Sequence, residues 1–121
     1  MPVLTEGPHP GGFLVWEALR DYTRETITLA AGTLAPGTVL GRITASGKYA
    51  AHDPDAVDGT QTAAAVLWGP ADASGGDAPA VALVRGPAIV NRHELVFAGT
   101  PSAGEIAAAH AALLAAGILV R

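Results

Sequence analysis

Three short apolar runs separated by turn-forming residues constrain the fold of this chain more than any other feature. The runs occupy residues 39–44, 63–68 and 80–84. The residues that separate and follow them are Ser46 and Gly47, Asp58 and Gly59, and Ser74, Gly75, Gly76 and Asp77. Because Gly and Asp tolerate the left-handed backbone that tight reversals need, residues 38–85 are predicted to form successive strands joined by turns and loops.

The runs at 63–68 and 80–84 are apolar at consecutive positions. Successive side chains of a strand point to opposite faces, so such a strand must be covered on both sides. The 121 residues are enough for one domain with a single core. We therefore expect that the chain cannot cover both faces alone. The pattern is interpreted as a β-barrel-like body that buries part of its surface against copies of itself.

The composition argues against several classes of partner. Aromatic residues make up only 5% of the chain, so its apolar content is mostly small side chains, which again favours oligomerisation. The net charge is −4, and the seven Lys and Arg residues form no basic stripe, so no nucleic-acid partner is expected. The absence of cysteine excludes disulfides and thiolate metal sites.

The same sequence predicts no membrane association. No run approaches the roughly 20 apolar residues that span a bilayer. The first twelve residues, MPVLTEGPHPGG, lack the basic start and apolar centre of a secretory signal. We expect a protein that is made as a soluble cytoplasmic product.

The N-terminal residues are rich in proline and glycine, which predicts a flexible arm. The candidate partner-binding residues follow directly, and they are Phe13, Leu14, Val15 and Trp16. An apolar run on a flexible tether is suited to adding a strand to the exposed sheet edge of a partner. The alternative, in which the run folds back over its own barrel, stays open. We thus divide the chain into a partner-binding arm (1–16) and a single β-rich domain (17–121).

Other elements follow from local patterns. Alternation in Arg24–Leu29 predicts a half-buried strand. Ser102 and Glu105 have the spacing of a capping box, which predicts a helix from about residue 103 to 116. Weaker signals predict a short strand at 88–91, a helical turn at 92–96 and a final strand at 118–120 that closes the sheet.

No metal or cofactor site is predicted. The four histidines, which are His9, His52, His93 and His110, have no metal-ligand spacing, and His110 is expected to pack on the apolar stripe of its helix. The acidic segment at 52–59 resembles a calcium loop, but its third Asp comes one residue late and Ala64 stands where a bidentate Glu is required. We interpret the segment as a solvated hairpin loop.

Three segments carry a resemblance to a known family. They are GTVLGRITASGKY at 37–49, DGTQTAAAVL at 58–67 and AAGILVR at 115–121. In this order and spacing, the chain resembles the head decoration proteins of lambda-like tailed phages from about Gly11 to Arg121.

The resemblance implies a structural role and no enzymatic activity. Such proteins bind as homotrimers to the outer surface of the expanded capsid at its local three-fold axes, and they stabilise the head against internal DNA pressure. It also implies a β-rich, clip-like body and an N-terminal arm that becomes ordered on the capsid, where it pairs with the major capsid protein. The expected location is the outer capsid surface of the virion, after synthesis in the bacterial cytoplasm.

Two other functions stay open at this point. One is a small β-barrel binding or hydrolytic domain with a site near His52, Asp53 and Asp58. The other is a fibre or tail accessory module that uses the same arm.

Overall fold

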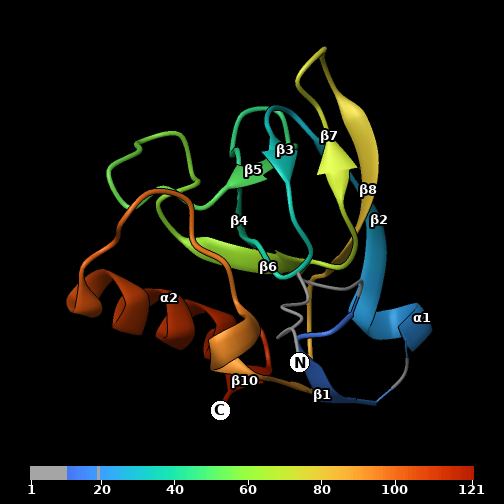
Figure 1. Cartoon of the computed structure of the whole chain (residues 1–121), viewed down its shortest axis with the longest axis vertical. Helices are drawn as coiled ribbons and strands as arrows, with labels where there is room; N and C mark the ends of the chain where they lie inside the picture. Colours follow the sequence, from blue (N-terminus) through green and yellow to red (C-terminus); the bar gives the residue numbers. More distant parts are fainter. Residues whose placement is uncertain (1–10, 19) are drawn as a thin grey trace, which may run out of the picture.

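The computed structural model describes residues 11–18 and 20–121. The greater part of the predicted arm, residues 1–10, lies outside the described residues. Strands predominate, and Figure 1 shows one long helix packed below them. The elements in chain order are β1 (Leu14–Glu17), α1 (Arg20–Thr23), β2 (Arg24–Leu29), β3 (Thr33–Leu34), β4 (Val39–Arg42), β5 (Tyr49–Ala51), β6 (Ala63–Leu67), β7 (Ala71–Asp72), β8 (Ala78–Leu83), β9 (Ala88–Val90), the 3-10 helix η1 (Arg92–Glu94), α2 (Ala103–Ala115) and β10 (Ile118–Val120).

Five strands close into a ring in the order β2-β5-β4-β6-β8. Its longest ladder joins β2 and β8 over the whole of both strands, while β2 and β5 meet only at the pair Leu29 and Tyr49. The alternation predicted for β2 is present, since Ile27 and Leu29 are buried while Thr26 and Thr28 are exposed. The prediction of a mainly β domain is confirmed, although the ring is uneven because one of its seams is a single residue pair.

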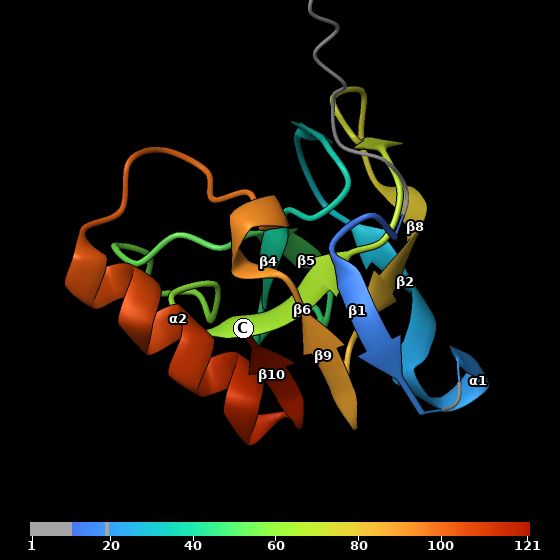
Figure 2. The same cartoon turned by 60° about the horizontal axis from the view of Figure 1, so that its bottom comes forward.

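A second layer lies against this barrel and is built from the two ends of the chain. It contains the sheet β1-β9-β10 and the helix α2 (Figure 2). The predicted capping box is present, because the Glu105 N–H donates to Ser102 Oγ (3.2 Å) and the Ser102 N–H donates to Glu105 Oε1 (2.8 Å). The strand predicted at 118–120 is also present. It pairs in parallel with β9 in this second sheet, however, and does not take part in the barrel.

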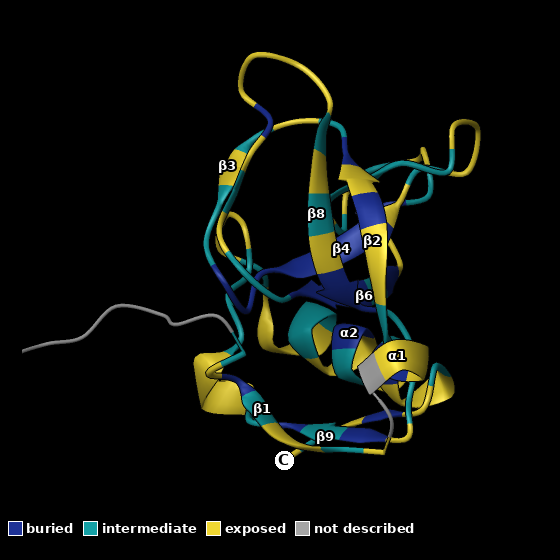
Figure 3. Cartoon of the chain, turned by 90° about the vertical axis from the view of Figure 1, so that its right-hand side faces the viewer, coloured by how far each residue is buried: buried dark blue, intermediate teal, exposed yellow. Residues whose placement is uncertain are grey.

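Strand β6 belongs to two separate hydrophobic cores, because its opposite faces contact different groups. Ala65 and Leu67 lie in the core inside the barrel. Ala63 and Val66 lie in the core between the barrel and the second layer, together with Leu113 of α2. Figure 3 shows β6 as a buried strand on the side of the barrel that faces α2.

This arrangement corrects the expectation for the run at 63–68, whereas in the run at 80–84 Val81 is 40% exposed. The chain does cover both faces of its most apolar strand without help from a second copy, because α2 and the β1-β9-β10 sheet form a second layer on the outer side of β6. Burial of β6 therefore gives no argument for self-association.

The smaller elements complete the body. Strands β3 and β7 form a separate two-stranded ribbon, and β4 and β5 form the hairpin predicted around Ser46 and Gly47. The short strand and helical turn predicted after residue 87 correspond to β9 and η1. The single helical turn α1 was not predicted. Within the described part of the chain, no helix has the length and apolar character needed to cross a membrane.

Candidate functional site

The four candidate partner-binding residues lie in the folded body, where they fall into two pairs. Phe13 is only 2% exposed and belongs to the core between the layers, and Leu14 packs against the same core. Val15 and Trp16 are 59% and 51% exposed. A β-bulge between Leu14 and Trp16 accounts for the two consecutive outward side chains. Contact between these residues and a partner stays a prediction, and in this conformation only Val15 and Trp16 are accessible for it.

Trp68 holds the beginning of the described chain in place. The Gly11 N–H donates to the Trp68 carbonyl (2.9 Å), and the Phe13 ring meets the indole edge-to-face at 5.6 Å between centroids. Gly11 has φ +67°, and a Cβ at this position would overlap the indole ring. Only glycine therefore fits here without a shift. These contacts fix the point at which the preceding residues join the body.

A polar cluster ties β1 to the barrel. Glu17 Oε2 accepts hydrogen bonds from Thr23 Oγ1 (2.7 Å) and from Arg24 Nε (3.2 Å), and Arg24 also contacts Glu17 Oε1. The Arg24 guanidinium lies 3.4 Å from the centroid of the Trp68 ring. A charge-assisted pair and a cation–π contact thus meet at one arginine. No local pattern in the sequence marks this cluster, because its members come from β1, α1, β2 and the end of β6.

The alternative site near His52, Asp53 and Asp58 does not assemble as one group. His52 is 4% exposed, and its Nδ1 lies 2.8 Å from the Thr60 carbonyl oxygen. The Asp53 carboxylate accepts from the Asp55 N–H (3.0 Å). The Asp58 carboxylate accepts from the Thr60 hydroxyl (2.6 Å) and N–H (3.1 Å), and these bonds lower the pKa of Asp58. All three groups stabilise the single loop between β5 and β6, and their side chains bond to its Thr60 and Asp55.

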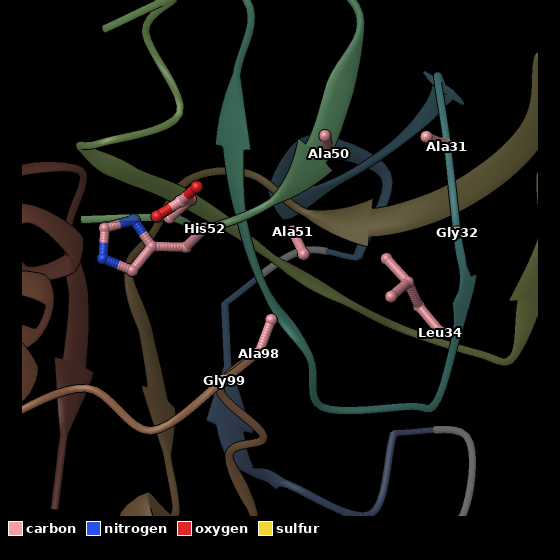
Figure 4. Close-up of a pocket in the computed structure, with 9 residues that line it drawn as sticks. Ala31, Gly32, Leu34, Ala50, Ala51, His52, Ala98 and Gly99 are labelled. Atoms are coloured by element: carbon pink, nitrogen blue, oxygen red, sulfur yellow. The ribbon is translucent and has the colours of Figure 1, made fainter. Parts of the chain in front are cut away.

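A pocket of about 430 Å³ adjoins His52. Its lining is mostly apolar, and Figure 4 shows the imidazole turned away from Ala31 and Leu34. Residues 11–18 and 20–121 contain no group of three His, Cys, Asp or Glu side chains placed to hold a metal ion. Nothing in this geometry supplies a nucleophile paired with a base, so it does not favour the hydrolytic interpretation.

His110 packs as expected. Its ring lies 6.3 Å from that of Phe97, whose other neighbour is His52 at 6.4 Å. Burial and the nearby positive charge of Arg92 lower the pKa of His110 below its usual value. The histidine therefore helps to pack the segment after η1 between β5 and α2.

The described chain is thus a small, mainly β domain with an apolar N-terminal strand exposed at two positions. A family model described as bacteriophage lambda head decoration protein D matches residues 3–118. The chain belongs to this family, and its role is in decoration of the phage capsid. The family is structural and not enzymatic, and it locates the protein at the virion capsid. Comparison with curated proteins gives no match.

Proposed function

We propose that the protein binds as a homotrimer to the outer surface of the expanded phage head at its local three-fold axes, and that it stabilises the head against internal DNA pressure. The observation that carries this proposal is the family match over residues 3–118 of the chain. The major capsid protein is the proposed partner.

We assign capsid binding to the N-terminal segment 1–16. Two of its described residues, Val15 and Trp16, expose large apolar side chains at the start of the sheet. Phe13 has a different role, because its buried side chain anchors the segment in the core. Residues 17–121 are the proposed decoration domain that carries the segment.

Three-fold symmetry would explain how weak contacts give firm attachment. A closed trimer presents three identical N-terminal segments to the capsid at once. After the first has bound, the others bind at high effective concentration, and avidity can exceed the affinity of a single segment by about 10²–10⁴. A protein that binds only the expanded lattice stabilises that lattice by mass action. This mechanism needs no reacting group.

Truncation tests the assignment, and the structure decides which truncation is informative. Removing residues 1–16 would take Phe13 from the core and most of β1 from its pairing with β9, so lost binding could reflect lost folding. Removing residues 2–10 leaves Gly11 and everything after it. We expect this shorter deletion to retain the wild-type sedimentation coefficient and thermal transition but to bind weakly to expanded heads that lack the protein.

Wild-type affinity after removal of residues 2–10 would contradict the role of the arm. A monomer at all concentrations in sedimentation would contradict the trimer. A fibre or tail accessory module would fail to saturate a fixed number of sites on the expanded head, whereas a decoration protein would saturate them.

A further inference from the structure

The outer face of the β1-β9-β10 sheet carries an apolar row. Trp16 is paired with Ile89, and Ile89 is paired with Leu119, so the three side chains form one row across the strands. The neighbours of Ile89, Ala88 and Val90, are buried in the core. Alternation along a strand therefore directs Ile89 and its two partners outward. Trp16 and Leu119 are 51% and 40% exposed, and Ile89 is half-buried.

One end of this row has a positive rim. Arg121 continues the ladder beyond β10, because its N–H donates to the Val90 carbonyl (3.0 Å) and its carbonyl accepts from the Arg92 N–H (2.9 Å). Both arginine side chains are exposed. Among the described residues, ion pairs engage Arg24, Lys48 and Arg85, and neither Arg92 nor Arg121 is in one. The rim thus carries two exposed arginines on a chain whose net charge is −4, beside the exposed Glu94 of η1.

We propose that this sheet face, defined by Trp16, Ile89, Leu119 and the rim arginines Arg92 and Arg121, is a second contact with the capsid, made by the folded body. Its partner is an apolar patch on the major capsid protein with carboxylates at its edge. The inference rests on the proposed function and extends it beyond the arm.

Two features favour the capsid as the occupant over a second copy of the chain. The face is continuous with the proposed capsid-binding segment, because Trp16 is the last residue of that segment and the first of the row. Its unpaired arginines also call for an acidic partner surface, and electrostatic complementarity of this kind sets orientation and association rate. An apolar centre with a charged rim is the usual anatomy of a protein–protein contact.

The test compares two exposed apolar residues changed to glutamate. Leu119→Glu places a carboxylate in the row, where it would meet apolar and acidic groups of the partner. Val57→Glu is the matched control, because Val57 is 95% exposed on the loop between β5 and β6. Binding of each variant to expanded heads lacking the protein is measured by co-sedimentation, and self-association by analytical ultracentrifugation. We expect Leu119→Glu to bind at least about tenfold more weakly, as for a central interface residue, and Val57→Glu to bind like wild type.

Arg121→Glu provides an independent measurement, since it leaves the apolar row intact. We expect this variant to bind more weakly than wild type and to show a smaller loss of affinity as salt is raised. If Leu119→Glu lowers the temperature of thermal unfolding, its weaker binding could reflect a damaged fold. The binding of Arg121→Glu then decides whether the sheet face contacts the capsid.

The outcomes separate this inference from the proposed function. If wild type itself does not bind expanded heads, the proposed function fails. If wild type binds and the folded Leu119→Glu and Arg121→Glu variants bind equally well, the sheet face is not a capsid contact. If Leu119→Glu abolishes self-association while Val57→Glu does not, a second copy covers the face and the inference is overturned.

Discussion

The barrel and the second layer solve the same problem of burial in different ways. The barrel strands lie between residues 24 and 83, and their core combines branched aliphatic side chains such as Leu40 and Leu67 with small ones such as Ala65 and Ala82. The second layer joins β1 from the start of the chain to β9, α2 and β10 from its end. The core between this layer and the barrel has a similar mixture of small and branched aliphatic side chains, such as Leu113 and Ile118, and adds the aromatic ring of Phe13.

This difference between a closed barrel and an open sheet shows where the molecule can present a surface to a partner. A closed ring has no free edge apart from its uneven seam, whereas an open three-stranded sheet has two edges and one uncovered face. Three of the exposed large apolar side chains, those of Val15, Trp16 and Leu119, lie on the β1-β9-β10 sheet. This clustering supports the proposal that the layer built from the chain ends contacts the capsid.

The largest effect is expected from cavities in the two cores. Leu67→Ala empties part of the barrel core and Leu113→Ala part of the second core, since both side chains are fully buried. Each should lower the free energy of unfolding by about 2–5 kcal/mol. Because β6 contributes to both cores, urea denaturation followed by fluorescence and circular dichroism should show one transition in both variants.

The matched control is Leu114→Ala, in which the side chain is 56% exposed on the same helix. It should change the free energy of unfolding by no more than about 0.5 kcal/mol. Two separate transitions in the Leu113→Ala variant would mean that the layers unfold independently, and the comparison would then describe two folding units.

A somewhat smaller loss is expected where the second layer closes on the barrel. A Cβ on Gly86 would overlap the carbonyl group of Gly117, so the links before β9 and before β10 pass too closely for any side chain. Gly86→Ala should lower the free energy of unfolding by about 3 kcal/mol, as overpacking against backbone does. Gly75→Ala is the control, because a Cβ there meets nothing within 4 Å. Equal thermal stability of the two variants would contradict this close approach.

The cluster that ties β1 to the barrel gives the next prediction. Arg24→Ala leaves the partly buried Glu17 carboxylate without its cation and should lower the free energy of unfolding by about 2 kcal/mol, less than for a fully buried pair. Arg85→Ala breaks the more exposed pair with Glu25 and should cost less than about 1 kcal/mol. Thermal denaturation of both variants measures the difference, and a larger loss for Arg85→Ala would refute the role given to the cluster.

The smallest effect is a pH dependence centred on His110. Its pKa in the folded protein lies below its ordinary value of 6.5, because burial and Arg92 disfavour the charged form. The unfolded chain then binds a proton first, so the stabilisation is complete above pH 6.5 and is lost as the pH falls through the folded-state pKa. His110→Gln should flatten the stability profile below about pH 6.5. A steeper profile in the variant would contradict this sign.

Asp58 and Asp72 act in a lower range of pH. Hydrogen bonds from Thr60 lower the pKa of Asp58, and those from Ser74 and Thr33 lower the pKa of Asp72. Their contribution to stability is therefore present above about pH 4 and decreases below it. The two windows can be separated in a single titration.

Local patterns predicted much of this structure. The alternation in Arg24–Leu29 and the capping box at Ser102 and Glu105 each identified an element from its own residues. The pairing of β1 with β9 could not be read in this way, because it joins residues more than 70 positions apart and no local signal encodes it. The sharing of β6 between two cores could not be read from local patterns either. Without it, the apolar run at 63–68 predicted burial through self-association.

The candidate site was predictable only in part. The apolar run at residues 13–16 predicts a partner contact, which stays a prediction. Alternation and the β-bulge decide that Val15 and Trp16 face outward while Phe13 is buried. Leu119 and Arg121 could be recognised only after the register across β1, β9 and β10 was known. A face formed by three strands from both ends of a chain exists only in the folded molecule.

The most direct test of the central claim is the stoichiometry of binding to expanded heads that lack the protein, measured as bound mass per head at saturation. A trimeric decoration protein should saturate at three copies for each local three-fold site, and the decorated heads should resist heat better than bare ones. Saturation at a different ratio, or binding without any gain in the stability of the head, would contradict the account.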